Sequence, residues 1–195
     1  RNPAEANFEQ RTGLVVAESI ITHNCECNVI YRMASLYDEG DVLTDREFGA
    51  LIGNESPELS TDEQDTLDSY INMGYIDINH FLRTGESGHR RARGGPITTV
   101  AVANLDSAMA KAAMPRSTLL YRGIPGIKGS SKFNNLNPGD VFRDKGYVST
   151  SADPVSGSIF AGNSSNVIVF EIQTPAGTSA LRGTSFEQEV ILHRD

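Results

Sequence analysis

Two acidic side chains near the end of the chain have the spacing needed to act on one substrate. Glu187 and Glu189 flank Gln188, and a strand is predicted to begin here and run through residues 189–192. Because side chains alternate along a strand, both carboxylates are predicted to face the same side. Paired carboxylates can stabilise a cation and transfer protons, although an acidic surface turn has the same composition.

Two earlier segments carry side chains that bind anions and carboxylates. Arg122 lies at the end of a β-type run and precedes Gly123, so its guanidinium could grip a phosphate in two-point contact while the glycine lets a ligand approach. In the run 147–151, alternation places Ser149 and Ser151 on one face of a strand and Thr150 on the other. Taken singly, a surface salt bridge and a solvated edge strand are the simpler interpretations of these two segments.

Taken together and in this order, the arginine, the Ser-Thr-Ser run and the Glu-x-Glu pair resemble the Arg–Ser–Glu branch of the mono-ADP-ribosyltransferases. That group contains actin-modifying binary toxins, injected bacterial effectors and phage enzymes. Residues 70–79, which read YINMGYIDIN, resemble the family's helical Tyr…Gly-Tyr-x-x-Ile-Asn segment. Phe160 matches an aromatic residue that packs on nicotinamide, and residues 175–177 match a Pro-x-Gly turn before the target-recognition loop. The resemblance extends over residues 42–195.

The resemblance implies cleavage of the nicotinamide–ribose bond of NAD and transfer of ADP-ribose to a protein. Glu189, held by Ser149, would stabilise an oxocarbenium-like ribose, and Arg122 would grip the pyrophosphate. Glu187 would position the acceptor, and Phe186 would belong to the target-recognition loop. The residues that the resemblance implies for NAD binding are Arg122, Gly123, Ser149, Thr150, Ser151, Phe160, Tyr70, Tyr75 and Asn79. It implies no metal.

Within the family, Glu at position 187 goes with arginine acceptors, whereas Gln goes with asparagine or other targets. A guanidinium matches a carboxylate geometrically, which gives this rule a physical basis. Two features depart from the family pattern. Gly123 stands where some members have a second basic residue, and Phe186 stands where a glycine often precedes the first Glu. Arginines 90, 91 and 93 could supply the missing phosphate charge, although a solvated basic loop is the simpler interpretation of them.

Composition and charge are those of a globular chain. The 195 residues are 38% hydrophobic and 22% charged, a length typical of one domain. Residues 1–113 carry 9 Lys/Arg against 18 Asp/Glu, and residues 114–195 carry 8 against 7. The net charge of −8 argues against nucleic-acid binding and leaves the second half as the better place for an anion. No apolar run is long enough for a membrane helix. The only cysteines, Cys25 and Cys27, form no disulfide framework or zinc pattern.

The elements that must position the site are predicted to be helices first and strands later, which is an α+β pattern. Helices are predicted within residues 9–37, over 45–52 and from 61 to 74, the last two opened by capping boxes at Thr44 and Ser60. Further helices are predicted at 75–83, 97–114 and 155–161, and strands at 118–121, 147–150, 167–173 and 189–192. Residues 84–96 and 123–139 are predicted loops.

The resemblance refines this pattern to the ADP-ribosyltransferase fold, with two facing, mainly antiparallel β-sheets and NAD between them. We therefore predict a helical extension at residues 1–41 and a catalytic domain at 42–195, with a helical part (42–114) and a β-rich core (115–195). The expected partner is a protein with an accessible arginine, such as actin, a small GTPase or another host protein. We expect secretion or injection into a host cell, and the start at Arg1 indicates an excised fragment.

Three other functions remain open at this stage. The site could mainly hydrolyse NAD as a glycohydrolase, because no suitable acceptor docks. The fold could instead serve as a catalytically weak NAD-binding or interaction module, although all three signature residues are present. An acidic helical interaction domain would suit residues 1–113 alone and would leave the second half unexplained.

Overall fold

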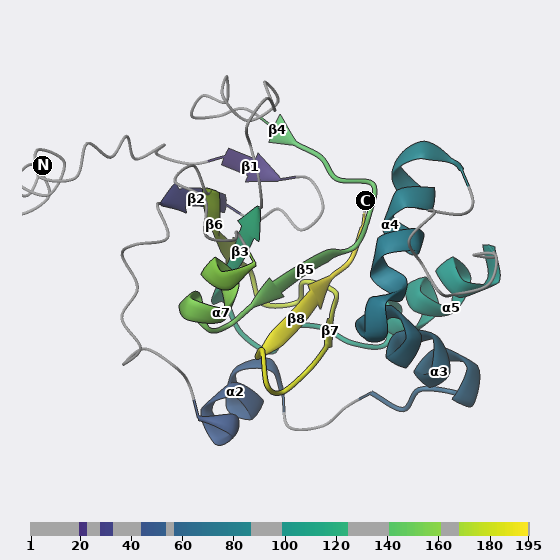
Figure 1. Cartoon of the computed structure of the whole chain (residues 1–195). Coiled ribbons are helices and arrows are strands. Elements are labelled where there is room, and N and C mark those ends of the chain that lie inside the picture. Colours follow the sequence, from purple (N-terminus) through teal and green to yellow (C-terminus); the bar gives the residue numbers. More distant parts are fainter. Residues whose placement is uncertain are drawn as a thin grey trace, which may run out of the picture.

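The computed structural model describes residues 20–22, 28–32, 44–53, 57–86, 99–124, 141–160 and 168–194. Helices dominate the first half of this part of the chain and strands the second half (Figure 1). The α+β class predicted from the sequence is therefore confirmed. No helix among these residues combines the length and the apolar character that a membrane span requires.

Eight strands form one hydrogen-bonded sheet in the order β4-β1-β2-β6-β3-β5-β8-β7. The strands in chain order are β1 (Ile20–Thr22), β2 (Asn28–Arg32), β3 (Thr118–Ile124), β4 (Val141–Phe142), β5 (Val148–Ser151), β6 (Ile168–Thr174), β7 (Ala180–Arg182) and β8 (Glu189–Leu192). All neighbouring strands are antiparallel except β1 and β4, which are parallel.

The sheet has a narrow junction in its middle. Strands β3 and β6 pair along seven residues, whereas β3 and β5 pair only at Tyr121 and Ser151. The strands of the two predicted sheets are thus present and mainly antiparallel, but this single pair joins them into one continuous sheet. The junction lies next to Arg122 and Ser149, so it brings these two predicted site residues close together.

Local sequence signals account for the helices. The capping boxes at Thr44 and Ser60 are both formed, and they open α2 (Asp45–Ile52) and α3 (Thr61–Ser69) as predicted. The remaining helices are α4 (Tyr75–Thr84), α5 (Thr99–Ala110) and the short α7 (Pro154–Ile159). Asp153 caps α7, since its carboxylate accepts from the backbone N–H groups of Val155 and Ser156.

The helix predicted at 61–74 does not end at Gly74, because the chain continues into α4 through a kinked turn, η3 (Tyr70–Gly74). Inside this turn Met73 has a φ of 86°, which a β-carbon normally disfavours. Gly74 is helical, and a Cβ there would lie 2.5 Å from the Ser69 carbonyl oxygen. Close packing at the kink therefore requires glycine. The kink also directs Tyr70 and α4 toward β5 and the residue before it.

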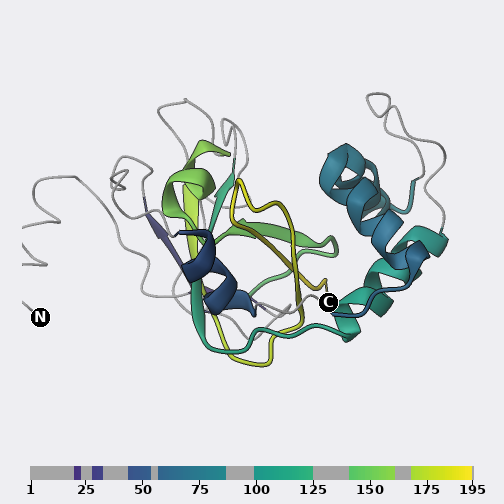
Figure 2. The same cartoon turned by 90° about the horizontal axis from the view of Figure 1, so that it is seen from below.

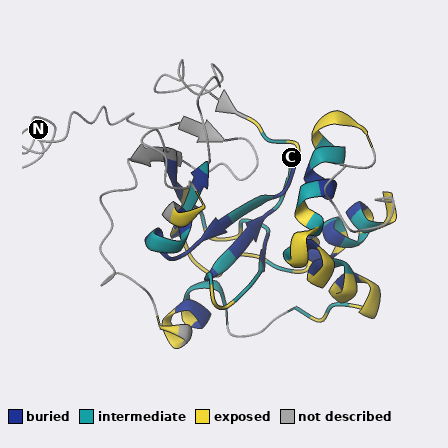
Figure 3. Ribbon diagram, viewed as in Figure 1, coloured by how far each residue is buried: buried dark blue, intermediate teal, exposed yellow. Residues whose placement is uncertain are grey.

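Strands β7 and β8 are buried on both faces (Figure 3). Val190 and Leu192 pack into a core with Phe48 of α2, whereas Ile191 packs into a second core with Leu105 of α5. Figure 2 shows α3, α4 and α5 gathered on one side of the strands, with α2 and α7 across from them. Each of the two cores buries a different face of the strand that carries Glu189, which holds that strand in place.

The predicted helix within residues 9–37 is wrong at both of its described parts. Residues 20–22 and 28–32 are strands β1 and β2, and β2 pairs with β6 over five residues from Asn28↔Gln173 to Arg32↔Val169. Pairing with a distant strand decides this conformation, since Asn28-Val-Ile-Tyr-Arg32 combines β-branched and aromatic residues that suit a sheet. The strands of residues 1–41 thus belong to the main sheet rather than to a helical extension. Cys25 and Cys27 lie outside the described residues.

Candidate functional site

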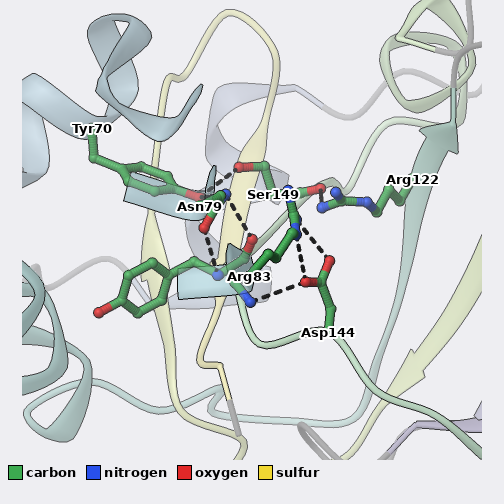
Figure 4. Close-up of polar contacts among 8 residues, drawn as sticks. Tyr70, Asn79, Arg83, Arg122, Asp144 and Ser149 are labelled. Carbon is green, nitrogen blue, oxygen red and sulfur yellow. Dashed lines mark hydrogen bonds and ion pairs between the residues drawn. The ribbon is translucent and has the colours of Figure 1, made fainter. Parts of the chain in front are cut away.

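Ser149 of β5 lies between the predicted arginine and the predicted carboxylate. Its backbone carbonyl accepts a hydrogen bond from Nη1 of Arg122 at 2.9 Å. Its hydroxyl lies 3.4 Å from the Tyr70 hydroxyl and also interacts with Glu189, where burial raises the pKa of the carboxyl group and this hydroxyl partly opposes the rise. One serine therefore contacts a cation through its backbone and a carboxylate through its side chain (Figure 4 draws the former).

Glu189, the first residue of β8, has a partly buried carboxylate. Its Oε2 accepts from the backbone N–H of Thr184 at 3.3 Å, and Gly183 lies so close that a Cβ there would be 2.2 Å from the same oxygen. Burial raises the pKa of Glu189, and the neighbouring charge of Glu187 raises it further. The negative charge of Glu189 is therefore costly at this place. A carboxylate in such surroundings interacts strongly with a cation that forms beside it.

Glu187 is near Glu189, but strand alternation is not the reason. Strand β8 begins at Glu189, and Glu187 belongs to the preceding turn, in which Gln188 has a φ of 47°. Thr184 connects the two acids, since its hydroxyl donates to Oε2 of Glu187 at 3.3 Å while its N–H faces Glu189. The prediction that both carboxylates point to one region agrees with this geometry, and its physical reason is the turn.

The hydroxyls of Thr150 and Ser151 are buried and form hydrogen bonds within the protein. Thr150 Oγ1 donates to the Val190 carbonyl at 2.6 Å. Ser151 Oγ donates to the Glu187 carbonyl at 2.6 Å and accepts from the N–H of Asp153 at 2.9 Å. Thr150 thus connects β5 to β8, and Ser151 connects β5 to the turn that carries Glu187 and to the residue that caps α7, so in this structure both side chains support the site.

Arg122 lies inside a strand rather than at its end, because β3 extends to Ile124. It pairs with Phe170 of β6, and the buried Gly123 pairs with Val169. Burial lowers the pKa of Arg122, and the nearby Asp144 carboxylate opposes this effect. A partly buried guanidinium presents its charge more strongly to an incoming anion than a fully exposed one does.

Two residues of this region carried no signal in the sequence analysis. Arg83, in the last turn of α4, donates from Nε to Oδ1 and from Nη2 to Oδ2 of Asp144, both at 2.7 Å (Figure 4). The Gly146 N–H also donates to Oδ1 at 3.0 Å. The two residues are separated by 61 positions, so a pattern search within one segment cannot find the pair.

Tyr70 and Asn79 attach the helices to β5. The buried Asn79 donates to the Tyr70 hydroxyl at 3.0 Å and to the Tyr147 carbonyl at 3.2 Å, and its Oδ1 accepts from the Tyr147 N–H at 2.8 Å (Figure 4). The rings of Tyr70 and Tyr147 meet edge to face with centroids 5.7 Å apart. Of the residues in the resembled helical segment, Tyr70 and Asn79 therefore lie beside Ser149 and are buried.

The three remaining predicted aromatic residues are exposed. Tyr75 is 40% exposed and meets the Tyr70 ring edge, Phe160 is 50% exposed just after α7, and Phe186 is 94% exposed at the turn that carries Glu187. Arginines 90, 91 and 93 lie outside the described residues. Within the part of the chain that the structure describes, no three His, Cys, Asp or Glu side chains are grouped as a metal site.

A family model and several solved structures match the chain, and they agree on one fold. The family model for the ADP-ribosyltransferase exoenzyme matches residues 45–195. No curated protein sequence matches the chain. BECa, an ADP-ribosylating toxin of a Clostridium perfringens binary enterotoxin solved with NADH, is 19% identical with a TM-score of 0.54, over 83% of this chain and 40% of its own.

Two further solved structures share the fold. Exoenzyme S from Pseudomonas aeruginosa, solved with carba-NAD and human 14-3-3 protein beta, is 22% identical with a TM-score of 0.50, over 70% of this chain and 63% of its own. The C3 exoenzyme of Clostridium limosum is 22% identical with a TM-score of 0.53, over 83% of this chain and 87% of its own. The chain thus spans well under half of BECa and less than two thirds of exoenzyme S.

Proposed function

The chain belongs to the ADP-ribosyltransferase exoenzyme family, and we propose that it transfers ADP-ribose from NAD to an arginine side chain of a target protein. The observation that carries the proposal is the double role of Ser149, which meets Arg122 through its carbonyl and Glu189 through its hydroxyl. A dinucleotide has an anionic pyrophosphate and, a few bonds away, the ribose that becomes cationic. The site offers a cation and a carboxylate on the strands either side of β5, each next to Ser149.

In this mechanism Arg122 binds the pyrophosphate through charge-assisted hydrogen bonds. Gly123 has no side chain to obstruct the dinucleotide on the same strand. Tyr70 and Asn79 hold Ser149 and Tyr147 in place, Thr150 holds β8 against β5, and Ser151 holds the Glu187 turn against β5. The exposed rings of Phe160 and Tyr75 are proposed to cover the nicotinamide end, which would exclude water during the reaction.

Glu189 is proposed to act on the ribose. The bond between the ribose and the nicotinamide nitrogen breaks, and its electron pair leaves with neutral nicotinamide. The ribose becomes an oxocarbenium-like cation, and the carboxylate of Glu189 stabilises that charge. The partly buried carboxylate favours this step because a weakly solvated anion interacts strongly with a new positive charge.

Glu187 is proposed to bind the acceptor. Its carboxylate lies in a turn in which the preceding residue, Phe186, is 94% exposed. A protein surface can therefore reach this turn. A guanidinium nitrogen of the target attacks the ribose carbon, and the released proton passes to Glu187. If no acceptor is bound, water takes its place, and the same site acts as an NAD glycohydrolase.

The family and the relatives named above are bacterial toxins and exoenzymes, so we propose that this chain also acts on a host protein after secretion or injection. The chemistry of the acceptor turn requires only an accessible arginine on that target. Actin and small GTPases are candidate targets on this basis.

The test is nicotinamide release from NAD, measured with an arginine-containing peptide, with the matched lysine peptide and with no peptide. Transfer predicts labelled ADP-ribose on the arginine peptide alone, together with faster nicotinamide release. Equal release under all three conditions would replace arginine transfer by glycohydrolysis, and no release with intact, NAD-bound protein would leave only a binding module. Labelled NAD added to a host lysate, followed by mass spectrometry of the modified band, identifies the target.

A further inference from the structure

Arg83, Arg122 and Asp144 bring two positive charges and one negative charge together beside β5 (Figure 4). Asp144 is mostly buried, with 14% of its side chain exposed; it contacts the guanidinium of Arg83 and interacts electrostatically with that of Arg122. Arg83 belongs to α4 and Arg122 to β3. Asp144 could in principle accept hydrogen bonds from either guanidinium.

The hydrogen bonds assign Asp144 to Arg83. Both of its oxygens accept from Arg83 at 2.7 Å, and the Gly146 N–H occupies a further lone pair of Oδ1. Gly146 packs closely against one side of this contact, because a Cβ there would lie 3.1 Å from Nη2 of Arg83. Arg122 donates to the carbonyl of Ser149 instead, and a neutral carbonyl leaves its full positive charge in place.

This assignment matters because a carboxylate and a phosphate are chemically similar ligands for arginine. Either can accept two parallel hydrogen bonds from one guanidinium. The charges of Asp144 and Arg122 already influence each other, so Asp144 is within electrostatic reach. A carboxylate released from Arg83 would therefore turn to Arg122 and compete there with an incoming pyrophosphate.

We propose that Arg83 is a positioning residue that engages Asp144 in two-point contact and so keeps the Arg122 guanidinium available for the pyrophosphate of NAD. This inference rests on the proposed function, since it assigns the pyrophosphate to Arg122. It goes beyond that function by assigning a role to two residues to which the proposed function gives none.

Two alternative roles for Arg83 lead to different results. Arg83 could contact the dinucleotide itself, and then its loss would weaken NAD binding whatever occupies position 144. The pair could also serve only to attach α4 to residues 143–147, and then its loss would lower stability without a specific effect on NAD affinity. The proposal differs from both because it predicts that removal of the carboxylate cancels the effect of removing Arg83.

The experiment is a double-mutant cycle on the full chain. Calorimetry measures NAD binding by the wild type, Arg83→Met, Asp144→Asn and the double variant, with Arg116→Met as the control for losing one exposed arginine. Arg83→Met is expected to raise the dissociation constant about tenfold. Asp144→Asn alone and the double variant are expected to stay within about threefold of the wild type, because Asn keeps the shape of Asp without its charge.

The outcomes separate the possibilities. A double variant as weak as Arg83→Met, or an Arg83→Met variant with unchanged affinity, overturns the proposal while the proposed function stands. A wild-type protein that binds no NAD overturns the proposed function and this inference with it. Urea unfolding of each variant identifies a loss of folding.

If Arg83→Met does not fold, Arg83→Lys takes its place in the cycle, since lysine keeps the charge but cannot form the two-point contact. A loss of about fivefold or more that Asp144→Asn removes is then expected, and a smaller loss or one that persists overturns the proposal.

Discussion

The site has an arginine end, consisting of Arg122, Arg83 and Asp144, and a carboxylate end, consisting of Glu187, Glu189 and Thr184. At the arginine end the guanidinium of Arg83 and the carboxylate of Asp144 are matched in a two-point contact of 2.7 Å bonds. At the carboxylate end two acids meet one threonine, through longer contacts of 3.3 Å. No basic side chain forms an ion pair with either acid among the described residues.

The difference between the two ends indicates that the arginine end serves binding and the carboxylate end serves the reaction. The ground-state dinucleotide already has its pyrophosphate charge, so the arginine end can be arranged for it in advance. The ribose becomes cationic only during the reaction, so a carboxylate without a cationic partner interacts most strongly at that moment. A site of this kind loses affinity when the arginine end is damaged and loses turnover when the carboxylate end is damaged.

The largest effect is expected for Glu189→Gln. Both transfer and NAD hydrolysis should fall by at least about 100-fold, because both pass through the same oxocarbenium-like state. NAD affinity should stay nearly unchanged. Nicotinamide release and calorimetry on the same preparation test this, and near-normal turnover would remove Glu189 from the reaction.

Arg122→Ala should show the opposite split. Loss of a charge-assisted contact worth about 1.5–3 kcal/mol should raise the NAD dissociation constant roughly ten- to a hundredfold. Turnover at saturating NAD should fall less than affinity does. Calorimetry with NAD measures the effect, and unchanged affinity would make Arg122 a structural residue of β3.

Glu187→Gln separates the two acids within the carboxylate end. Transfer to an arginine peptide should fall about tenfold or more, while NAD hydrolysis continues, since water needs no carboxylate to bind a guanidinium. Both rates are measured in one preparation. A parallel loss of both would mean that Glu187 acts only through its charge on Glu189, and the arginine specificity would be withdrawn.

A matched pair of glycine substitutions compares the carboxylate end with the Asn79 contacts beside the arginine end, using equal chemical changes. Gly183→Ala places a methyl group 2.2 Å from Oε2 of Glu189, so it should move that carboxylate and lower turnover several-fold. Gly146→Ala places one 2.7 Å from Oδ1 of Asn79, so it should reduce stability by about 1–3 kcal/mol through overpacking. Urea unfolding and nicotinamide release on both variants check this. The reverse assignment of the two effects would contradict the comparison.

The smallest effect concerns pH. The raised pKa of Glu189 means that the folded state holds its proton more tightly than the unfolded state. Stability from this group is therefore full below the unfolded pKa and declines as pH rises through the folded pKa. Glu189→Gln should make the protein more stable than the wild type at pH 7.5, and the difference should shrink at pH 4. Urea unfolding at both values tests this, with Glu58→Gln as the control for net charge.

Much of the helical part could be predicted because its signals are local. The capping boxes at Thr44 and Ser60 need only a residue and its third neighbour, and both helices begin where the pattern predicts. Strand β8 also lies at the predicted residues 189–192. By contrast, the helix predicted at residues 20–22 and 28–32 is wrong, because the strand pairing of β2 with β6 is a contact across more than a hundred residues.

The candidate site divides in the same way. The order of Arg122, Ser149 and Glu189 along the chain is enough to predict the family, since the chemistry needs those residue types on neighbouring strands. The predicted reason why Glu187 lies beside Glu189 is wrong, because the turn with Gln188 at positive φ replaces strand alternation. Arg83 and Asp144 could not be predicted at all, because their pairing joins α4 to a segment far along the chain.

Local sequence specifies which side chains are available for chemistry and which helices and strands form from local signals. Three-dimensional packing selects which of those side chains meet, above all that Asp144 pairs with Arg83 while Arg122 donates to a carbonyl. The physical reason is that composition and spacing specify donors and acceptors, whereas the choice among several oppositely charged partners depends on distance and burial. Distance and burial are set by how the two cores pack against the two faces of the same strands.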